Sequence, residues 1–591
     1  MRLFTSPEEC KILFRKHRKM IADYAKTREN LQPIRFAILS GATTHPLRNI
    51  LELVLLDSGF NPSFFEGDYN AFAFEARFSQ ALVDFGPDVV YFHTSIDNIV
   101  DGPDVTTNAT DASARLSAIW SEFKGAAEAV LSRTKAQVIL NSFEPPNYRI
   151  SGNYEAVAQG GTVRTVNQIN LWLTDFAQDN ARVYLNDVAW LAAKVGLENW
   201  RDDKSYAAFK QPFTARAQAE IAQSLAGLTR ALMGRAAKGL ILDLDNTLWG
   251  GVIGDDGVDG VKIGAGDAKG EAYLAFQKAL RPLLQRGIAF AVSSKNEAEI
   301  AIKGLNRNEM ALRESDFHIL RINWKPKSQN IVEIRQALNV GMEALIFIDD
   351  SAFERAEVHA ALPELTVPEV EADPFSYLQA LSSSYAFEVT TISKDDLSRG
   401  ESFKAMANFA MAAESGTDMD AFLRRQAMRY TLSPLTDSNV DRVHQLINKT
   451  NQFNLTGQRL NLAEVEAFRD RGTLFAASLE DKATQYGLIS VVWGEVEGDT
   501  FELANWVMSC RVFNRRLEHV IFLQLYRQLA GQGVTRIRAR YLPTEKNKPV
   551  ADLLGTLGLT PIGTENGATV YECDVPSATI EELSKMEELY L

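Results

Sequence analysis

Short apolar runs alternate with amphipathic segments along most of the chain, a rhythm that is typical of parallel sheets connected by helices. Three such runs stand in the first part of the sequence, at Ile34–Gly41, Asp88–Ser95 and Ala136–Phe143. Helical, amphipathic stretches separate them. The pattern predicts an α/β domain over residues 1–235.

The same rhythm begins again at Lys238 and defines a second α/β domain, residues 236–385. Its apolar strands are predicted inside the segments 238–251, 288–296, 316–330 and 344–358. A polar, helical connector is predicted over 386–427. The last part, 428–591, has antiparallel-looking strands and two late helices, which predicts an α+β domain.

Composition adds limits to this three-domain picture. The 591 residues are too many for a single core, and the 46% hydrophobic and 23% charged content is ordinary for a globular protein. A formal net charge of −14 argues against a general nucleic-acid binder. Three scattered cysteines, no signal-peptide core and no membrane-spanning apolar run lead us to expect a cytoplasmic protein without a membrane partner.

Two aspartates follow the apolar run that opens the second domain. Asp243 and Asp245 are two residues apart, so their carboxylates lie on one side of a strand end, where open α/β sheets bind ligands. One carboxylate can attack phosphorus while the other transfers protons. We assign Asp243 as nucleophile and Asp245 as acid/base, and we expect Asn246 and Thr247, next in the sequence, to bind substrate.

A second acidic pair, Asp349 and Asp350, ends another apolar strand. Carboxylates approach a phosphate only if a hard cation offsets their charge, and Mg²⁺ suits oxygen ligands. Asp349 is the favoured magnesium ligand, together with Asp243 and the carbonyl of Leu244, and Asp350 is a candidate to share the role.

Two further residues complete the set. Ser294 follows an apolar strand and can hydrogen-bond a phosphoryl oxygen, while Lys327 can neutralise charge in the transition state. Lys325 is a competing choice for this lysine. Taken singly, each piece also fits a solvated loop or a helix cap, but four pieces in this order resemble the haloacid-dehalogenase (HAD) superfamily. That resemblance implies a Rossmann-like parallel sheet and a phosphoaspartate mechanism.

The spacing between these residues leaves little room for a cap domain over the site. About fifty residues separate Asp243 from Ser294, and about thirty separate Ser294 from Lys327. Much of each interval is needed for a helix of the sheet itself. We therefore expect a capless site, open to a large or tethered substrate or closed by another domain.

The last domain contains a second chemical candidate, Cys510, between a predicted strand and a helix. The nearby Arg511, together with Arg515 and Arg516, would favour the thiolate, as would the start of the helix. That suits a cysteine that carries an acyl group, with Arg511 as a substrate-binding residue. The alternative is a plain core cysteine, because strand alternation places it on one face with Trp506 and Met508.

Polar residues elsewhere in this domain could line a phosphate site. Lys449 and Asn451 belong to one cluster and Asn547 to another, and we assign all three to substrate binding. Each cluster is also explained by a helix end followed by a loop.

Several segments together resemble the FkbH-like proteins, a HAD subgroup (IIIC). They are DLDNTLWGGVIGDDG, SSKN, NWKPK, IDDSAFER, KTNQFNLT, MSCRV and PTEKNKPV. The resemblance spans roughly Lys238 to Val575 and extends more loosely through the first domain. It implies an SGNH-like first domain, a GNAT-like last domain, and transfer of a glyceryl group from 1,3-bisphosphoglycerate to an acyl carrier protein. Cys510 would then hold the acyl thioester, and polyketide or related metabolism is the implied setting.

The chain departs from this pattern in two places. Family members often read SCRV-x-G-R-G, whereas Asn514 and Arg516 stand here at the two glycine positions, which puts an unmodified pantetheine site in doubt. The first domain has Ser40 and Gly41 after a strand but no late Asp-x-x-His pair. We therefore expect it to be a binding or docking module. Rival hypotheses are a stand-alone phosphatase for a small phosphate ester and a non-enzymatic scaffold.

Overall fold

The computed structural model describes the chain with some gaps. The described residues are 17, 19–21, 31–99, 104–371, 373–392, 396–397, 399–401, 403–406, 419–450, 452–471, 473–482, 485–509, 512–513, 515–544, 547–575 and 580–590. They fall into two compact units, Met1–Ala236 with Leu381–Thr390, and Ala237–Ala380 with Thr391–Leu591. Because the second unit contains two separate sheets, the predicted α/β class with three sheet-based domains is confirmed.

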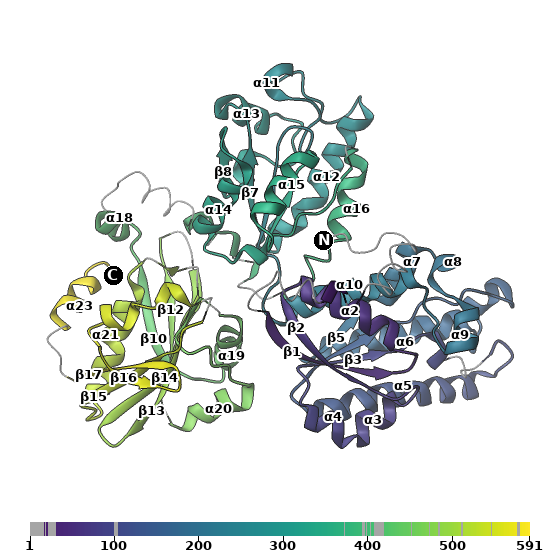
Figure 1. Ribbon diagram of the computed structural model, residues 1–591, viewed down its shortest axis with the longest axis horizontal. Helices are drawn as coiled ribbons and strands as arrows, with labels where there is room; N and C mark the ends of the chain where they lie inside the picture. The colour runs from purple at the N-terminus through teal and green to yellow at the C-terminus, as the bar shows by residue number, and fades with distance from the viewer. Residues whose placement is uncertain are drawn as a thin grey trace. The chain divides into compact units, whose positions relative to one another are not determined.

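The first unit is a five-stranded parallel sheet with the order β2-β1-β3-β4-β5 and helices on both faces (Figure 1). Its strands are β1 (Gln32–Ser40), β2 (Phe60–Glu66), β3 (Val89–His93), β4 (Gln137–Asn141) and β5 (Val183–Asn186). Its helices are α2 (His45–Asp57), α3 (Phe72–Phe78), α4 (Gln80–Phe85), α5 (Ala109–Arg133), α6 (Thr162–Asp179), α7 (Val188–Val195), α8 (Leu197–Trp200), α9 (Asp203–Phe209) and α10 (Ala215–Leu232).

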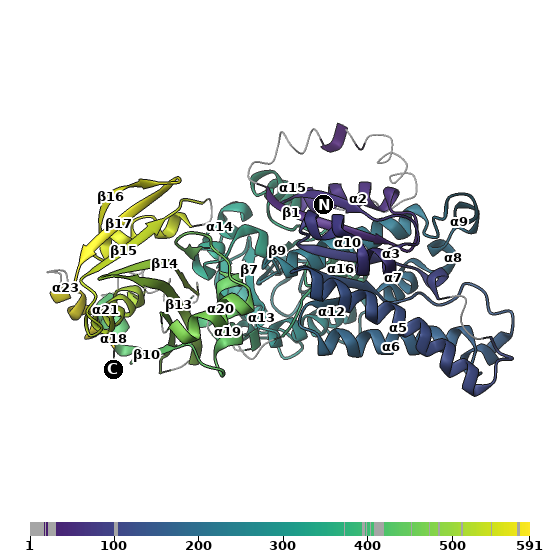
Figure 2. The ribbon, with the colours of Figure 1, turned by 90° about the horizontal axis from the view of Figure 1, so that it is seen from below.

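The alternation of side chains along the strands gives this unit two apolar cores, one on each face of the sheet. Residues of α2, α7 and α10 pack on one face, and residues of α3, α5 and α6 pack on the other. The two long helices α5 and α6 run side by side in Figure 2. Leu381–Thr390 lies with this unit rather than with the predicted domain 236–385, because Tyr385 is buried in the first of these cores.

The α/β domain that follows has a four-stranded parallel sheet with the order β8-β7-β6-β9. Its strands are β6 (Gly239–Leu242), β7 (Ala289–Ser294), β8 (Ile319–Ile322) and β9 (Leu345–Ile348). Its helices are α11 (Ile253–Asp256), α12 (Ala268–Gln285), α13 (Ala298–Leu305), α14 (Lys327–Leu338), α15 (Ala352–Ala361) and α16 (Tyr377–Ser382). The interval from β6 to β7 is described throughout and holds only α11 and α12 as helices, so no separate cap domain is inserted there.

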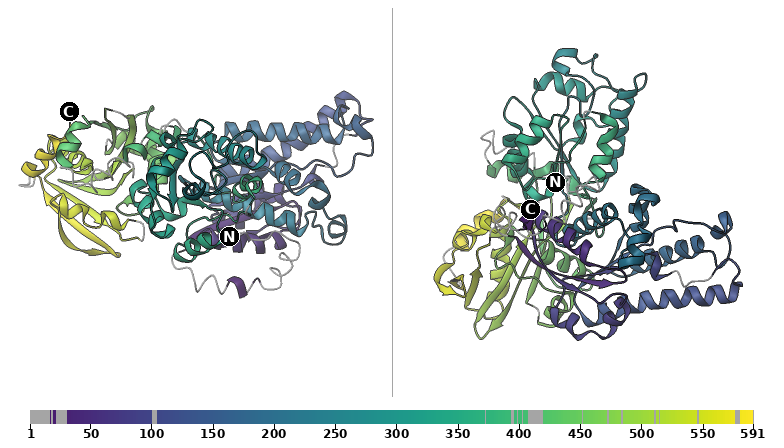
Figure 3. Two further views of the ribbon diagram at one scale, coloured as in Figure 1. Left: turned by 90° about the horizontal axis from the view of Figure 1, so that it is seen from above. Right: turned by 45° about the vertical axis from the view of Figure 1, so that its right-hand side comes forward.

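The C-terminal sheet, drawn from green to yellow in Figure 3, is mixed, with the order β10-β12-β13-β14-β15-β17-β16. The strands are β10 (Arg429–Pro434), β11 (Phe453–Asn454), β12 (Leu474–Glu480), β13 (Gln485–Glu497), β14 (Thr500–Met508), β15 (Arg536–Tyr541), β16 (Thr560–Glu565) and β17 (Ala568–Asp574). The helices are α18 (Met419–Arg425), α19 (Val440–Lys449), α20 (Leu462–Arg471), α21 (Leu517–Ala530), α22 (Leu553–Thr556) and α23 (Ile580–Glu587).

The two central strands of this sheet, β14 and β15, pair in parallel only over Thr500–Leu503. The end of β14 pairs instead with the short strand β11, through Val507 and Met508. The other neighbouring strands are antiparallel, as the sequence predicted.

In the described part of the chain, no helix combines the length and the apolar character that crossing a bilayer requires.

Candidate active site

The predicted nucleophile lies at the carboxyl end of a central strand. β6 is fully buried between β7 and β9, and Asp243 follows its last residue. The backbone N–H of Asp243 still donates to the carbonyl of Ile348 in β9, at 3.0 Å. Sheet pairing therefore fixes this aspartate at the edge where parallel sheets bind ligands.

A tight turn follows Asp243. The carbonyl of Leu244 accepts hydrogen bonds from the backbone N–H groups of Thr247 and Leu248, at 3.1 and 2.8 Å. Asn246 adopts a left-handed backbone with φ of 51°, which asparagine tolerates better than most residues. The turn itself uses this oxygen, and the metal-ligand role of the Leu244 carbonyl stays a prediction.

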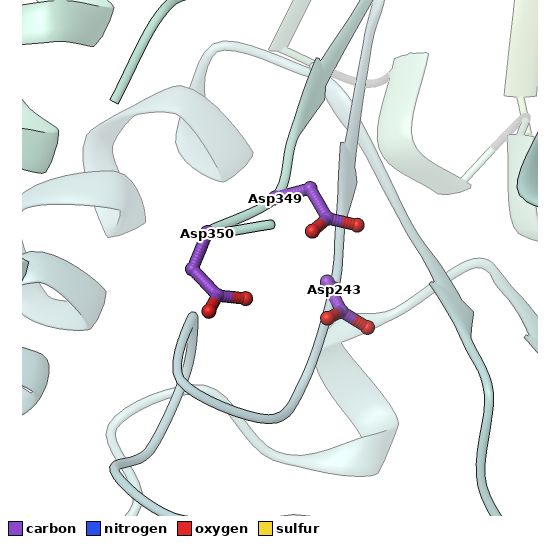
Figure 4. Close-up of side chains that lie close together, drawn as sticks. All are labelled: Asp243, Asp349 and Asp350. Carbon is purple, nitrogen blue, oxygen red and sulfur yellow. The ribbon is translucent and has the colours of Figure 1, made fainter. Parts of the chain in front are cut away.

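Three carboxylates gather at the ends of two neighbouring strands (Figure 4). Asp243 follows β6, and Asp349 and Asp350 follow β9, which pairs with β6. One oxygen from each of the three lies within 4.8 Å of the others. Opposite oxygen ligands of a Mg²⁺ ion are about 4.2 Å apart, so small side-chain movements would place all three around one ion.

Lys327 is the one cation in the described structure that forms ion pairs with this cluster. It is the first residue of α14 and is almost fully buried, and its Nζ lies 3.0 Å from Asp243 Oδ2 and also contacts Asp349 Oδ2. The alternative candidate, Lys325, is exposed and pairs with Glu333 at 2.7 Å. The structure thus brings Lys327, and not Lys325, to the carboxylates.

Burial and mutual repulsion shape the ionisation of these groups. Burial raises the pKa of Asp243 to about 6, although Lys327 opposes the shift. Burial also raises the pKa of Asp349 and Asp350. Burial alone would lower the pKa of Lys327, but the two carboxylates that it contacts outweigh this effect and raise it. The single ammonium group of Lys327 cannot neutralise three carboxylates.

The residues present fit a divalent cation. With all three carboxylates ionised and Lys327 protonated, the cluster carries a net charge of −2. In addition, Asp243 Oδ1 is buried without a hydrogen-bond partner in the described structure. A buried acceptor of this kind is costly unless a ligand completes its contacts.

Asp245 sits in a different environment, held by three donors. Its Oδ1 accepts hydrogen bonds from Trp249 Nε1 at 2.9 Å and from the N–H of Ile253 at 3.0 Å. Its Oδ2 accepts from Asn296 Nδ2 at 2.9 Å. The same amide group of Asn296 lies 3.2 Å from Ser294 Oγ, so it connects the acid/base candidate with the serine that is predicted to bind phosphate.

Asn296 and Trp249 were not predicted as site residues. Both occur in segments that carry the family resemblance, DLDNTLWGG and SSKN. Membership in these segments was the one feature of the sequence that could have indicated them as site residues. Asn296 is buried and follows Ser294 by two residues, a spacing that returns its side chain to the same strand end. We consider both to be residues that orient Asp245.

Replacing Asn296 by alanine is expected to lower kcat of phosphate release by about 10-fold to 100-fold, because one of the three donors that orient Asp245 is lost. Steady-state kinetics would measure the effect, and Asn306→Ala, which removes an exposed amide that bonds Glu314, is the matched control. Equal kcat for Asn296→Ala and the wild type would exclude this role.

Asn246 and Thr247 have structural contacts of their own. Asn246 Oδ1 accepts from the N–H of Gly251 at 2.9 Å, and Thr247 Oγ1 accepts from the N–H of Asp350 at 3.3 Å. Thr247 is fully buried and thereby connects the two strand-end loops that carry the carboxylates. Both lie beside the cluster, and their predicted contact with substrate stays a prediction.

The C-terminal candidates are only partly described. Cys510, Arg511, Asn514 and Asn451 lie outside the described residues, as does the side chain of Lys449, whose backbone ends α19.

Asn547 has structural contacts of its own, and its predicted substrate-binding role stays a prediction. Its side chain is buried, its Nδ2 donates to the carbonyls of Asn454 and Leu542, both at 2.9 Å, and its Oδ1 accepts from the N–H of Thr544. The amide is fully engaged in holding its own loop against the strand end.

Two arginines near Cys510 have separate roles. Arg515 is buried, paired with Asp481 at 3.0 Å and bonded to the hydroxyl of Tyr486, so its charge is already compensated. Arg516 has a left-handed backbone with φ of 60° at the start of α21. This is one of the positions at which the family resemblance leads one to expect glycine, and the backbone there is of the kind that glycine favours.

In the first unit, the described residues at the end of β1 do not form a recognisable catalytic arrangement. Ser40 is buried and its hydroxyl donates to the carbonyl of Ala42 at 2.6 Å. Asp202 caps α9, and Asp203 pairs with Arg201 at 2.5 Å. The expectation of a binding or docking module stays a prediction.

A solved phosphatase-domain structure resembles much of this chain. It is the crystal structure of the N-terminal part of the protein BF1531 from Bacteroides fragilis, containing a phosphatase domain complexed with Mg. It has 27% sequence identity and a TM-score of 0.58, and the match covers 64% of this chain and 98% of that one. This likeness supports the predicted phosphatase-type α/β fold.

Acetyltransferase structures also match part of the chain. The ribosomal-protein-S18-alanine N-acetyltransferase from Escherichia coli is 14% identical with a TM-score of 0.20, over 25% of this chain and 96% of that one. The PaiA N-acetyltransferase from Thermoplasma acidophilum, in complex with coenzyme A, is 9% identical with a TM-score of 0.21, over 24% and 98%. Scores this low leave the GNAT-like identity of the last domain a prediction. No protein-family model and no curated protein sequence matches the chain.

Proposed function

We propose that the chain is a phosphoryl-transfer enzyme that releases phosphate through an aspartyl-phosphate on Asp243. The observation that carries the proposal is the cluster of Asp243, Asp349 and Asp350 at the ends of β6 and β9, in which Lys327 pairs with the two buried carboxylates, Asp243 and Asp349. Asp243 attacks phosphorus, and Asp245 gives a proton to the leaving oxygen. Asp245 then removes a proton from the water that hydrolyses the aspartyl-phosphate.

Asp243, Asp349 and Asp350 are the residues that would hold Mg²⁺. When bound, the ion offsets the charge between carboxylates and phosphate, which is the chemistry that the net charge of the cluster requires. Magnesium in the phosphatase domain of the Bacteroides fragilis protein supports this assignment. Lys327 holds positive charge beside the nucleophile, and Ser294 would donate to a phosphoryl oxygen.

The fuller reaction that we propose is transfer of a glyceryl, or related three-carbon, acyl group from a phosphorylated donor such as 1,3-bisphosphoglycerate to an acyl carrier protein. The thiolate of Cys510 would attack the acyl phosphate and expel phosphate, which forms a thioester. Asp243 would remove the remaining phosphoryl group. The thiol of the phosphopantetheine arm would then take the acyl group and release Cys510. The resemblance of the SCRV segment and its neighbours to FkbH-like proteins supports this part.

The test is the intact mass of purified carrier protein after incubation with this enzyme, Mg²⁺ and 1,3-bisphosphoglycerate. We expect a glyceryl mass shift with the wild type and none with Cys510→Ala, with Cys573→Ala as the matched control. The control is suitable because Cys573 lies on β17 and burial raises the pKa of its thiol to about 11.

A stand-alone phosphatase is the alternative, and the same experiment separates it from acyl transfer. Mg²⁺-dependent phosphate release without a mass shift on the carrier would leave only the phosphatase reaction. A mass shift that persists in Cys510→Ala would remove the cysteine from the pathway.

A further inference from the structure

A buried tyrosine outside the predicted site holds the loop that carries both catalytic aspartates. The hydroxyl of Tyr377, the first residue of α16, donates to the carbonyl of Asn246 at 2.6 Å. Its ring is almost fully buried and packs edge-on against Phe276 of α12, with ring centroids 5.6 Å apart. The donor is therefore rigidly placed.

The carbonyl that accepts the hydrogen bond from Tyr377 belongs to the turn that follows Asp243 and Asp245. Asn246 directly follows Asp245 and has the left-handed backbone that turns the chain back after β6. Its side chain closes the same loop by accepting from the N–H of Gly251. A backbone of this kind persists only where its surroundings fix it, so loss of one anchor should loosen the loop.

Eight residues later, a second buried tyrosine is anchored in the first unit. The hydroxyl of Tyr385 donates to Glu220 Oε2 at 2.6 Å and accepts from Lys194 Nζ at 3.0 Å. Arg230 donates to the backbone carbonyl of Tyr385 at 2.8 Å. Burial raises the pKa of both Tyr377 and Tyr385 far above the usual value for tyrosine, so both keep their protons at any physiological pH.

We propose that Tyr377 is a positioning residue for the loop that follows Asp243, and that the segment Tyr377–Tyr385 connects this loop to the first unit. Loosening of the first unit around Tyr385 then makes the loop more mobile. The two anchors are in different compact units, and Tyr385 follows Tyr377 by only eight residues, five of which belong to α16. A disturbance at Tyr385 is passed along this short segment to Asn246. The kinetic consequence rests on the proposed phosphatase activity, whereas the mechanical coupling does not.

The test is amide hydrogen exchange of the full-length protein, read by mass spectrometry on peptides that cover residues 240–252. We expect faster exchange of this loop in Tyr377→Phe and a smaller increase of the same kind in Tyr385→Phe. Tyr184→Phe is the matched control, because it removes a tyrosine hydroxyl that donates to a backbone carbonyl, that of Ala181, elsewhere in the first unit. It should leave the loop unchanged.

Rates give a second readout on the same variants, with acetyl phosphate as substrate. We expect kcat to fall about 10-fold in Tyr377→Phe and about 3-fold in Tyr385→Phe, with KM within about 2-fold of the wild type. The double variant should lose less than the product of the single effects, as expected for residues that act through one element.

Unchanged exchange over residues 240–252 in Tyr385→Phe would overturn the coupling, whatever the activity of the enzyme. Unchanged exchange in Tyr377→Phe would overturn the positioning role. A wild type that releases no phosphate would contradict the proposed function, and the exchange data would still decide the coupling.

Discussion

Asp243→Asn is expected to abolish phosphate release, with a loss of about four orders of magnitude or more in kcat, because the amide cannot form the aspartyl-phosphate. The substitution is nearly isosteric. It also removes one negative charge from a cluster in which three carboxylates share one ammonium group. Folding should therefore be unaffected or slightly favoured, and the loss of activity should not arise from unfolding.

Phosphate release and the thermal midpoint of unfolding, measured on the same preparation, check this prediction. Asp255→Asn is the control, because Asp255 is an exposed carboxylate on α11, twelve residues further along the chain. Activity of Asp243→Asn within about 10-fold of the wild type would assign the nucleophile to another residue. A fall in its thermal midpoint without Mg²⁺ would contradict the charge argument.

Lys327→Met should have the second largest effect, on both stability and rate. Without the ammonium group, the buried carboxylates of Asp243 and Asp349 lose their partner, and breaking a buried ion pair in this way typically costs about 3–5 kcal/mol. The thermal midpoint of the domain should fall by roughly 10 °C. Loss of charge beside the transition state should lower kcat by about 10²-fold to 10³-fold.

Magnesium should rescue the stability of this variant but not its rate. The cation would supply the charge that Lys327 no longer provides, so the rise in thermal midpoint on adding Mg²⁺ should be larger for Lys327→Met than for the wild type. Differential scanning calorimetry with and without Mg²⁺ measures this. Lys325→Met is the matched control, since its exposed pair with Glu333 should be worth only about 0–1 kcal/mol. Equal shifts for the two variants would exclude the buried role of Lys327.

The central strands could be predicted from the sequence because they are continuous apolar runs. β1, β3, β4, β6, β7 and β9 all read this way, and the aspartates that follow β6 and β9 stood out against them. The edge strands β2 and β5 were missed. β2 has the sequence FNPSFFE, with a proline, and is only partly buried, so it lacks the apolar signal of a central strand.

The parts of the site that could not be predicted depend on residues far apart in the sequence. Tyr377 lies 131 residues after Asn246, and no local pattern connects the two. The hydrogen bonds that the Leu244 carbonyl accepts depend on how the turn closes, which residue types do not reveal. The contacts that the Asn547 side chain makes within its own loop were not predictable either, because a polar loop that binds ligand and one that is held by its own hydrogen bonds have the same composition.

The position of Leu381–Thr390 in the first unit also has a consequence for the order in which the protein matures on the ribosome. The unit's main segment ends at Ala236, yet Tyr385, which occupies its core, belongs to a segment that ends 154 residues later, at Thr390. At about 5–20 residues per second, the ribosome needs roughly 10–30 s to synthesise this interval. The sheet of the phosphatase-like domain is translated within it, so the N-terminal unit can complete its core only after that sheet has been synthesised.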